Sequence, residues 1–339
     1  MRPSFHPRLI NGPFDDPGLL VNLVFRKQAL LFDVGNLRAL SPGDVLKIDP
    51  VFVTHTHMDH FIGFDQLLRM LLGRDKRLRL FGPKGFLSQV AAKLAGYTWN
   101  LVHNYREALV IDATEIDDDR RVSQTFAAQT GFKGSERQTQ PAAGGPIFSD
   151  AAFEVHAALL DHHTPCLAFN VQERFHVNVL KEHLAQMDLP VGPWLTRFKQ
   201  LLHQQADPDT PILVPTPGDA PGQRRFTLGR LAHTVCRITP GQKIAYVTDA
   251  LYSPANADKI VTLARDADHL FIEAAFLQSE AAIARAKYHL TAHQAGLLAR
   301  RANVARMTIF HHSPRYADQA HLLCREARLA FRGEADTAQ

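Results

Sequence analysis

The sequence has few cysteines, no long apolar run and no apparent secretory signal. Its three cysteines, Cys166, Cys236 and Cys324, are odd in number and widely spaced among 339 residues, which excludes a disulfide framework or a zinc finger. The longest apolar runs, such as 19–25, fall well short of the ~20 residues that a membrane-spanning helix needs. We therefore expect a cytoplasmic protein whose cysteines are reduced, buried thiols.

The excess of positive charge is small. Lysine and arginine outnumber aspartate and glutamate by 38 to 34, which gives a formal net charge of +4, and the pI is about 9.0. This balance is compatible with a polyanionic partner but does not establish one. The length permits one large domain or two small ones, and either can bury a core.

Short apolar segments alternate with segments of helical periodicity along most of the chain. Strands are expected at 19–25, 28–33, 51–54, 78–81, 153–160, 166–172, 243–249, 269–272 and 306–310. Helices are expected at 66–72, 86–94, 177–187, 194–204, 255–265, 291–301 and 317–331. This alternation predicts a layered α/β architecture. The pattern weakens at 117–150, where a loop or exposed hairpin is expected, and at 208–223, where Pro and Gly indicate a mobile arm or its stalk.

The densest group of metal-binding side chains follows the strand expected at 51–54. Three histidines and an aspartate, His55, His57, Asp59 and His60, lie within six residues, too concentrated for a surface loop that happens to contain histidine. Histidine and aspartate are natural ligands of zinc-like divalent ions. Since side chains at i and i+2 of an extended segment point the same way, His55 and His57 can bind one ion together. Asp59 and His60 come after the strand and can turn toward a second ion.

Further ligands are expected at the ends of other strands, because one such motif cannot complete two coordination shells. Asp249 ends one apolar strand, His162 or His163 follows a second, and His311 or His312 follows a third. Strand ends of α/β proteins converge on one edge of a sheet, where ligands usually bind. Asp249 alone could also be a helix cap.

Together these residues predict a centre of two metal ions. The expected arrangement places His55, His57 and His162 on a first ion, Asp59, His60 and His311 on a second, and Asp249 between the two. Two ions ~3.5–4 Å apart generate a hydroxide at neutral pH and stabilise both the attacking and the leaving oxygen. Phosphodiester hydrolysis suits that chemistry. We expect zinc, with manganese as the alternative.

The motif at 55–60 resembles that of the metallo-β-lactamase superfamily, and further segments resemble ribonuclease Z, the tRNA 3′-processing endonuclease. These segments are Leu80-Phe81-Gly82-Pro83-Lys84-Gly85, Leu160-Asp161-His162, Pro190-Val191-Gly192-Pro193, Val247-Thr248-Asp249, Glu273-Ala274-Ala275-Phe276, His289-Leu290-Thr291-Ala292 and His311-His312-Ser313-Pro314-Arg315-Tyr316. The likeness selects His162 over His163 and His311 over His312 as the ligands.

The resemblance implies a fold and an assembly. The implied fold is α/β, a metallo-β-lactamase-like four-layered αβ/βα sandwich in a single domain, 1–339, with a protruding arm inserted at about 174–235. The family's arm grips tRNA, so Gly192 and Pro193 are expected to contact the substrate. The resemblance also implies a homodimer in which the arm of one subunit serves the active site of the other.

Catalytic roles follow from the same resemblance. Asp59 would orient or deprotonate the attacking water, and His289 is the candidate general acid for the leaving 3′-oxygen, since imidazole titrates near neutral pH. The alternative for His289 is a histidine at a helix start that only bonds to backbone. Glu273 either orients His289 or merely ends a strand in a salt bridge. Arg315, close to His311, is expected to contact the substrate or to brace the site.

Three functions are compatible with these features. The first is a metal-dependent endoribonuclease that removes the 3′ trailer of precursor tRNA. The second, a small-molecule or cyclic-nucleotide phosphodiesterase, would share every metal ligand and lack only a productive arm. The third is a non-catalytic metal-binding protein that binds RNA or acts as a scaffold, and fewer than two tightly bound ions per chain would favour it. A β-lactamase or thioesterase fits the ligand set less well.

Overall fold

The computed structural model describes residues 3–24, 26–142, 144–216 and 222–334. Contacts divide the chain into two compact units, a smaller one built from 148–154 and 172–242 with the N-terminus up to Ser4, and a larger one built from 5–147, 155–171 and 243–339. Within the described ranges, no helix combines the length and the apolar character that crossing a membrane requires.

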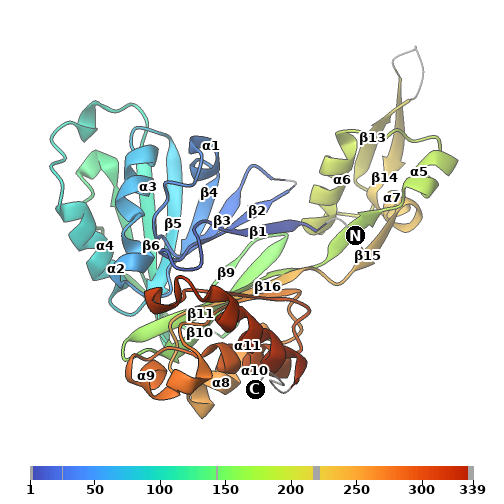
Figure 1. The fold of residues 1–339 in the computed structure, drawn as a ribbon. Helices are drawn as coiled ribbons and strands as arrows, with labels where there is room; N and C mark the ends of the chain where they lie inside the picture. The colour runs from blue at the N-terminus through green and yellow to red at the C-terminus, as the bar shows by residue number, and fades with distance from the viewer. Residues whose placement is uncertain (1–2, 25, 143, 217–221, 335–339) are drawn as a thin grey trace. The chain divides into compact units, whose positions relative to one another are not determined.

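The first sheet of the larger unit has eight strands in chain order (Figure 1). They are β1 (Phe5–Leu9), β2 (Leu19–Leu23), β3 (Ala29–Phe32), β4 (Ile48–Phe52), β5 (Lys76–Pro83), β6 (Leu109–Ile116), β7 (Arg120–Ala127) and β8 (Gln138–Pro141). Strands β3 to β6 run parallel to one another, so their carboxyl ends meet at one edge. The stretch at 117–150, expected to be a loop or hairpin, contributes β7 and β8 as antiparallel neighbours of β6.

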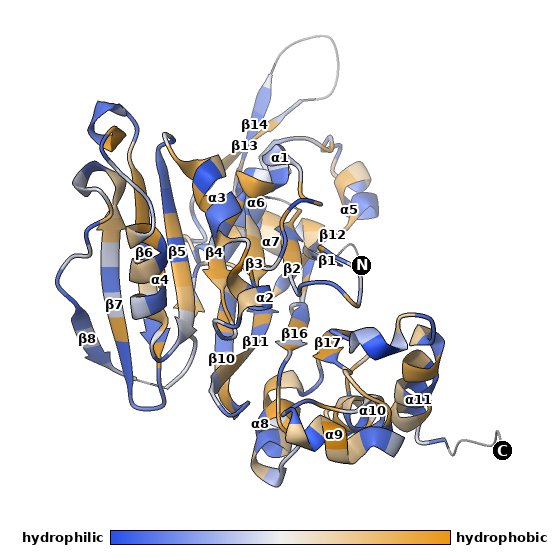
Figure 2. Cartoon of the chain, turned by 60° about the vertical axis from the view of Figure 1, so that its left-hand side comes forward, coloured by the Kyte–Doolittle hydropathy of each residue, from blue (hydrophilic) through white to orange (hydrophobic). Residues whose placement is uncertain are grey.

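Helices cover the outer face of this sheet. They are α1 (Pro42–Val45), α2 (Met58–Phe61), α3 (Phe64–Leu71) and α4 (Phe86–Ala95), with short 3-10 turns η1 (Val102–Asn104) and η2 (Ala128–Thr130). In α3, Phe64, Leu67, Leu68 and Leu71 recur at helical spacing and are buried. Figure 2 shows hydrophobic and hydrophilic residues on different sides of these helices. The core of this half therefore forms between α3, α4 and the sheet.

The second sheet has six strands in the order β18-β17-β16-β11-β10-β9. Its strands are β9 (Phe148–Ser149), β10 (Phe153–Asp161), β11 (Pro165–Glu173), β16 (Lys243–Val247), β17 (His269–Glu273) and β18 (Met307–Phe310). The helices beside it are α8 (Pro254–Ala264), α9 (Ala281–Ala286), α10 (Ala292–Arg301) and α11 (Ala320–Arg332), with turns η3 (Gln278–Glu280) and η4 (Pro314–Tyr316). Thr291 caps α10 as the sequence predicts, because its side chain accepts the N–H of Gln294.

A layer of aromatic rings joins the two sheets. Phe52 of the first sheet stacks on Phe32 with 5.1 Å between ring centroids and lies 5.5 Å from Phe169 of the second sheet. Tyr246 of the second sheet lies 5.9 Å from Phe32. These rings are fully buried, and helices cover the outer faces of both sheets. This arrangement confirms the expected four-layered αβ/βα sandwich.

The smaller unit has its own core and two short antiparallel sheets. Strand β12 (His176–Val179) pairs with β15 (Cys236–Thr239), β13 (Pro211–Pro215) pairs with β14 (Gln223–Thr227), and the helices are α5 (Lys181–Gln186), α6 (Trp194–His203) and α7 (Leu228–Val235). Trp194, Phe198 and Leu231 are among its buried residues. The helix at 194–204 is confirmed, whereas the helix at 177–187 is wrong over its first residues, since Val177 and Val179 pair with β15. Of the arm expected at 208–223, residues 217–221 lie outside the described residues.

Candidate metal centre

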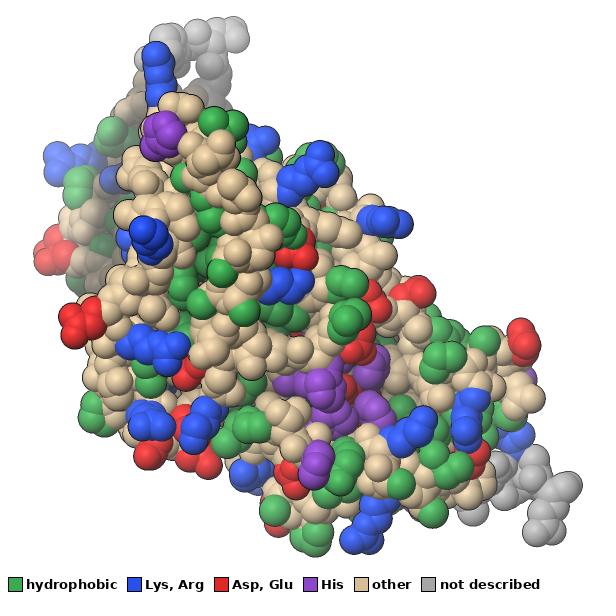
Figure 3. All heavy atoms as spheres, turned by 90° about the vertical axis from the view of Figure 1, so that its left-hand side faces the viewer, with side chains coloured by type: hydrophobic (Ala, Val, Ile, Leu, Met, Phe, Trp, Pro, Cys, Tyr) green, Lys and Arg blue, Asp and Glu red, His purple; other side chains and the backbone are tan. Residues whose placement is uncertain are grey.

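Five strands of the larger unit end at a single cluster of His, Asp and Glu side chains. Strand β4 leads into His55, β10 into His162, β16 into Asp249 and β18 into His311, while β17 ends at Glu273 itself. Figure 3 shows the histidine side chains gathered in a hollow of the surface. The carboxyl ends of neighbouring strands thus bring together residues that are far apart in sequence.

The first group consists of His55, His57, His162 and Asp249. The potential ligand atoms of these four side chains all lie within 4.8 Å of one another. The Oδ2 atom of Asp249 is 3.4 Å from Nε2 of His55 and 3.5 Å from Nε2 of His162. Three imidazoles and a carboxylate at this separation match the donor types and number of a four-coordinate zinc-like site.

A second group consists of Asp59, His60 and His311, whose potential ligand atoms also lie within 4.8 Å of one another. The Oδ2 atom of Asp59 is 3.2 Å from Nε2 of His311 and 3.4 Å from Nε2 of His60. Nε2 of His60 is also 3.2 Å from Oδ2 of Asp249. The Asp249 carboxylate therefore faces histidines of both groups.

A buried glutamate holds His289 beside these groups. Nδ1 of His289 lies 2.8 Å from Oε2 of Glu273 and 3.7 Å from Oδ1 of Asp249. The other oxygen of Glu273 accepts the backbone N–H groups of Ala250, at 2.8 Å, and Leu290, at 3.1 Å. Glu273 thus connects the loop after β16 to the loop that carries His289, and it holds both loops beside the cluster.

Hydrogen bonds on the far side of the rings set the histidine tautomers. Nδ1 of His60 donates to Oδ2 of Asp33 at 2.9 Å, and Nδ1 of His162 donates to the carbonyl of Tyr288 at 2.8 Å. Each bond places a proton on Nδ1 and turns Nε2 into the cluster, as the nitrogen that can bind a metal. Among the described residues, the buried atoms Nε2 of His55, Nε2 of His60 and Nδ1 of His311 make no well-oriented hydrogen bond, although they lie 3.4, 3.2 and 2.8 Å from oxygens of Asp249. A divalent metal ion satisfies such orphaned nitrogens, so this donor set fits a metal.

The electrostatics of the cluster favour the metal-binding protonation states of His55, His57 and Asp249. Burial, reinforced by His60, lowers the pKa of His55 to about 2, and burial with the neighbouring His162 lowers the pKa of His57. Burial opposes ionisation of Asp249, yet His311 and His60 together hold its pKa well below the usual value. Burial opposes protonation of His60 and His311, yet the Asp249 carboxylate raises the pKa of both rings well above the usual value. A divalent ion that binds at these two rings therefore displaces a proton from each.

The cluster forms the wall of an open pocket of about 470 Å³. Its lining includes His57, Asp59, His162, Asp249, His289 and His311, together with Phe276 and Lys287. The phenyl ring and the ammonium group add an apolar face and a positive charge beside the ligands. The chemistry of this lining suits a substrate that carries a phosphate and a flat ring.

The remaining candidate residues contact groups other than the metal-binding side chains. The guanidinium group of Arg315 pairs with Glu280 and lies 5.6 Å from the centroid of the Phe276 ring, so Arg315 packs on a pocket residue from outside. His163 is exposed and stacks on Tyr288. Nδ1 of His312 is bound to the carbonyl of Ala274. Gly192 and Pro193 belong to the smaller unit, just before α6.

Sequence reasoning missed the residues that orient the ligands. Asp33 is fully buried and accepts hydrogen bonds from the backbone N–H of Thr54 at 2.7 Å and from the hydroxyl of Tyr246 at 3.0 Å. Its only signal in the sequence is that it ends a strand, as Asp249 does.

The comparisons with known proteins agree with this geometry. Residues 16–149 match the family described as beta-lactamase superfamily domain. The chain is 30% identical over 292 residues to the ribonuclease Z of Deinococcus radiodurans, which covers 85% of this chain and 83% of that relative. It is also 30% identical to the ribonuclease Z of Geobacillus kaustophilus, over 84% of this chain and 77% of the relative.

Two solved structures share the fold. The metallo-beta-lactamase fold protein YhfI of Bacillus subtilis aligns with a TM-score of 0.55 at 16% identity, over 97% of this chain and 95% of the other. The short form of human tRNase Z aligns with a TM-score of 0.50 at 17% identity, over 93% of each chain. Both likenesses show the fold of the chain.

Proposed function

The chain belongs to the ribonuclease Z family of metal-dependent hydrolases, and on this premise we propose that it is an endoribonuclease that removes the 3′ trailer of precursor tRNA. The observation that carries the proposal is the position of His289. Its ring shares the pocket of the metal-binding groups and is held by Glu273. A proton donor placed beside a metal centre is what cleavage of an unactivated phosphodiester needs.

We propose that the centre holds two zinc ions. One would be held by His55, His57 and His162, the other by Asp59, His60 and His311, and Asp249 would bridge the two. The ions would supply an activated water and neutralise the charge that develops on the phosphate. Five imidazoles among seven ligands favour zinc, with manganese as the alternative, over magnesium or calcium.

The side chains around the ligands complete the reaction. In the proposed mechanism Asp59 orients the attacking water and accepts its proton. His289 gives a proton to the leaving 3′-oxygen, and Glu273 positions its ring. This division gives one carboxylate the role of base and one imidazole the role of acid, on the two sides of the scissile phosphate.

Substrate binding and assembly are part of the same proposal. We infer that the smaller unit is the arm that grips tRNA through Gly192 and Pro193, inserted into one metallo-β-lactamase domain. The protein would be a homodimer, with the arm of each subunit serving the other's site. Arg315 would act on the RNA-binding pocket through its contact with Phe276. The cysteines are free, with Cys166 buried as expected and Cys324 exposed against expectation, and free thiols are compatible with a cytoplasmic enzyme.

The test is cleavage of a 3′-extended precursor tRNA beside hydrolysis of bis(p-nitrophenyl) phosphate, with zinc or manganese added. Hydrolysis of both substrates, with the RNA cut next to the discriminator base, is the expected result. Turnover of the small diester alone would contradict the tRNA proposal and move the function to a small-molecule phosphodiesterase. Turnover of neither substrate, with fewer than two ions bound per chain, would favour the non-catalytic alternative.

A further inference from the structure

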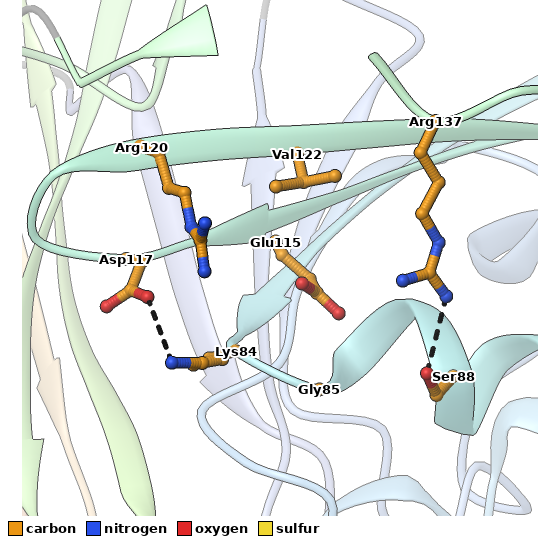
Figure 4. A pocket seen from close by; sticks show the side chains of 8 residues that line it. All are labelled: Lys84, Gly85, Ser88, Glu115, Asp117, Arg120, Val122 and Arg137. Carbon is orange, nitrogen blue, oxygen red and sulfur yellow. Dashed lines mark hydrogen bonds and ion pairs between the residues drawn. The ribbon is translucent and has the colours of Figure 1, made fainter. Parts of the chain in front are cut away.

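A second pocket, of about 270 Å³, lies in the larger unit away from the metal centre. It is enclosed by the turn after β5, the start of α4 and the hairpin between β6 and β7 (Figure 4). Three basic residues line it, Lys84, Arg120 and Arg137, together with the carboxylates Glu115 and Asp117. Its size is near the lower limit of small-ligand sites, which suits one phosphate and its sugar.

The carboxylates of this pocket are already engaged. Oε1 of Glu115 accepts the backbone N–H of Leu87 at 3.0 Å and so caps the start of α4. Oδ2 of Asp117 lies 3.8 Å from Nζ of Lys84. The start of α4 is therefore not itself an open anion site, and any such site has to come from the two arginines.

The guanidinium groups of Arg120 and Arg137 have no carboxylate partner among the described residues. Arg137 makes one hydrogen bond, of 3.4 Å, to the hydroxyl of Ser88. Figure 4 shows both side chains reaching from the β7–β8 side toward the wall formed by Lys84 and Ser88. Two unpaired guanidinium groups that face the same small pocket favour a planar, multivalent acceptor such as a phosphate.

The pocket lies at the same sheet edge as the metal centre. Strands β4, β5 and β6 are parallel neighbours, and just after their ends come His55, Lys84 and Asp117 respectively. Neighbouring strands lie about 4.8 Å apart, so the pocket residues that follow β5 and β6 are displaced sideways from β4 by about 5 and 10 Å. Figure 3 shows Lys and Arg side chains, with carboxylates among them, on the face that carries the histidine cluster.

We propose that this pocket binds a backbone phosphate of the RNA substrate, a few nucleotides from the scissile bond. The inference rests on the proposed function, because a strand with its scissile phosphate at the metal centre can pass along this sheet edge. A contact of this kind adds affinity without reading sequence. It also makes cleavage of RNA depend on salt more strongly than hydrolysis of a small diester, which is too short to reach the pocket.

The test compares the full-length wild type with the double variant Arg120→Gln/Arg137→Gln. For precursor tRNA, kcat/KM is expected to fall about tenfold, and the slope of log kcat/KM against log salt should flatten by about 1, the value for one lost phosphate contact. Hydrolysis of bis(p-nitrophenyl) phosphate should be unchanged. Arg77→Gln is the matched control, since Arg77 lies at the opposite end of β5 and pairs with Asp112.

The outcomes separate this inference from the proposed function. If the wild type cleaves precursor tRNA and the double variant matches Arg77→Gln in kcat/KM and salt slope, the phosphate site is wrong and the function stands. If the wild type does not cleave precursor tRNA, the pocket is tested alone by the anisotropy of a labelled single-stranded RNA. Weaker binding by the double variant then supports the site, and equal binding overturns it.

Discussion

The Nδ1 atom of His60 lies 2.9 Å from Oδ2 of Asp33, and both side chains are fully buried. Oδ1 of Asp33 accepts the backbone N–H of Thr54 at 2.7 Å, and the hydroxyl of Thr54 lies 2.9 Å from Oδ1 and 3.0 Å from Oδ2. These bonds fix the orientation of the carboxylate, so Oδ2 is the oxygen that accepts the N–H of His60. This bond places a proton on Nδ1 of His60 and leaves Nε2, which faces Asp59 and Asp249, as the nitrogen available to a metal.

Asp33→Asn should weaken zinc binding by about 10- to 100-fold. Because Thr54 requires an oxygen at the Oδ1 position, the amide nitrogen replaces Oδ2 and faces the N–H of His60, which forces the imidazole into the other tautomer. Zinc titration with a competing chelator measures the effect. Tyr246→Phe is the control, since it removes one hydrogen bond to Asp33 and keeps the charge. Equal zinc affinities for the two variants, both folded, would contradict this role of Asp33.

His162→Asn should abolish turnover of bis(p-nitrophenyl) phosphate and lower the metal content per chain while the fold is kept. The ring belongs to the cluster of His55, His57 and Asp249. The matched control is His163→Asn at the next position, where the backbone is left-handed with φ of 62° and asparagine is tolerated. Metal analysis and circular dichroism check both variants. Full activity of His162→Asn would refute the ligand assignment.

His289→Gln should slow cleavage of precursor tRNA by about 10²- to 10⁴-fold and leave hydrolysis of bis(p-nitrophenyl) phosphate nearly unchanged. The 3′-oxygen of RNA is a poor leaving group that needs a proton, whereas a nitrophenolate leaves without one. The ratio of the two rates therefore reports the acid itself, and unchanged metal content excludes loss of an ion. Equal losses on both substrates would show that His289 acts on the metal centre instead.

His269 should make the protein less stable in acid. Burial, with Arg306 adding to it, lowers the pKa of His269 to about 4. Between about pH 6.5 and about pH 4 the unfolded chain binds a proton at His269 that the folded chain does not. The free energy of unfolding therefore decreases as the pH is lowered through this window, and His269 causes no further decrease below it. Urea unfolding of His269→Gln should show a smaller fall than the wild type, with the exposed His321→Gln as control. Parallel pH profiles would contradict this.

Gly63→Ala should destabilise the fold by about 1–3 kcal/mol. A Cβ at Gly63 would lie 2.0 Å from the carbonyl oxygen of Gly35 and 3.0 Å from the side chain of Leu37, so the backbone behind the metal motif would have to move. At Gly43, by contrast, the nearest atom is 3.8 Å away, and Gly43→Ala should stabilise by up to about 1 kcal/mol. Denaturant unfolding compares the pair, and equal stabilities would rule out the steric explanation.

Much of the fold followed from the sequence because its signals are local. Strands such as β4 and β16 are short apolar runs that end in polar residues, and the helix capped by Thr291 has its capping residue in place. The start of β12 was not predictable in this way. Val177 and Val179 become a strand by pairing with β15, which lies some sixty residues later in the sequence, and periodicity within a segment carries no information about such a partner.

The difference between local signals and contacts with distant segments also applies to the site. The histidine-rich motif is recognisable within six residues of sequence, and the ends of predicted strands indicate further candidates such as Asp249. The role of Asp33 depends instead on a contact with Tyr246, more than two hundred residues away. Arg315, expected to contact the substrate or to brace the site, pairs with Glu280 and packs on Phe276 of the pocket.

Three residues that end strands at the centre, Asp33, Asp249 and His311, have left-handed backbone with φ of 56°, 50° and 58°. For residues with a side chain this conformation costs about 1–3 kcal/mol, and Asp, Asn and His tolerate it best. The path of the chain therefore limits which donors can stand at these positions. Asp, Asn and His, which supply oxygen and nitrogen ligands, fit this backbone conformation, whereas β-branched residues are destabilised in it. The backbone thus narrows the range of chemistries this edge of the fold can acquire by substitution.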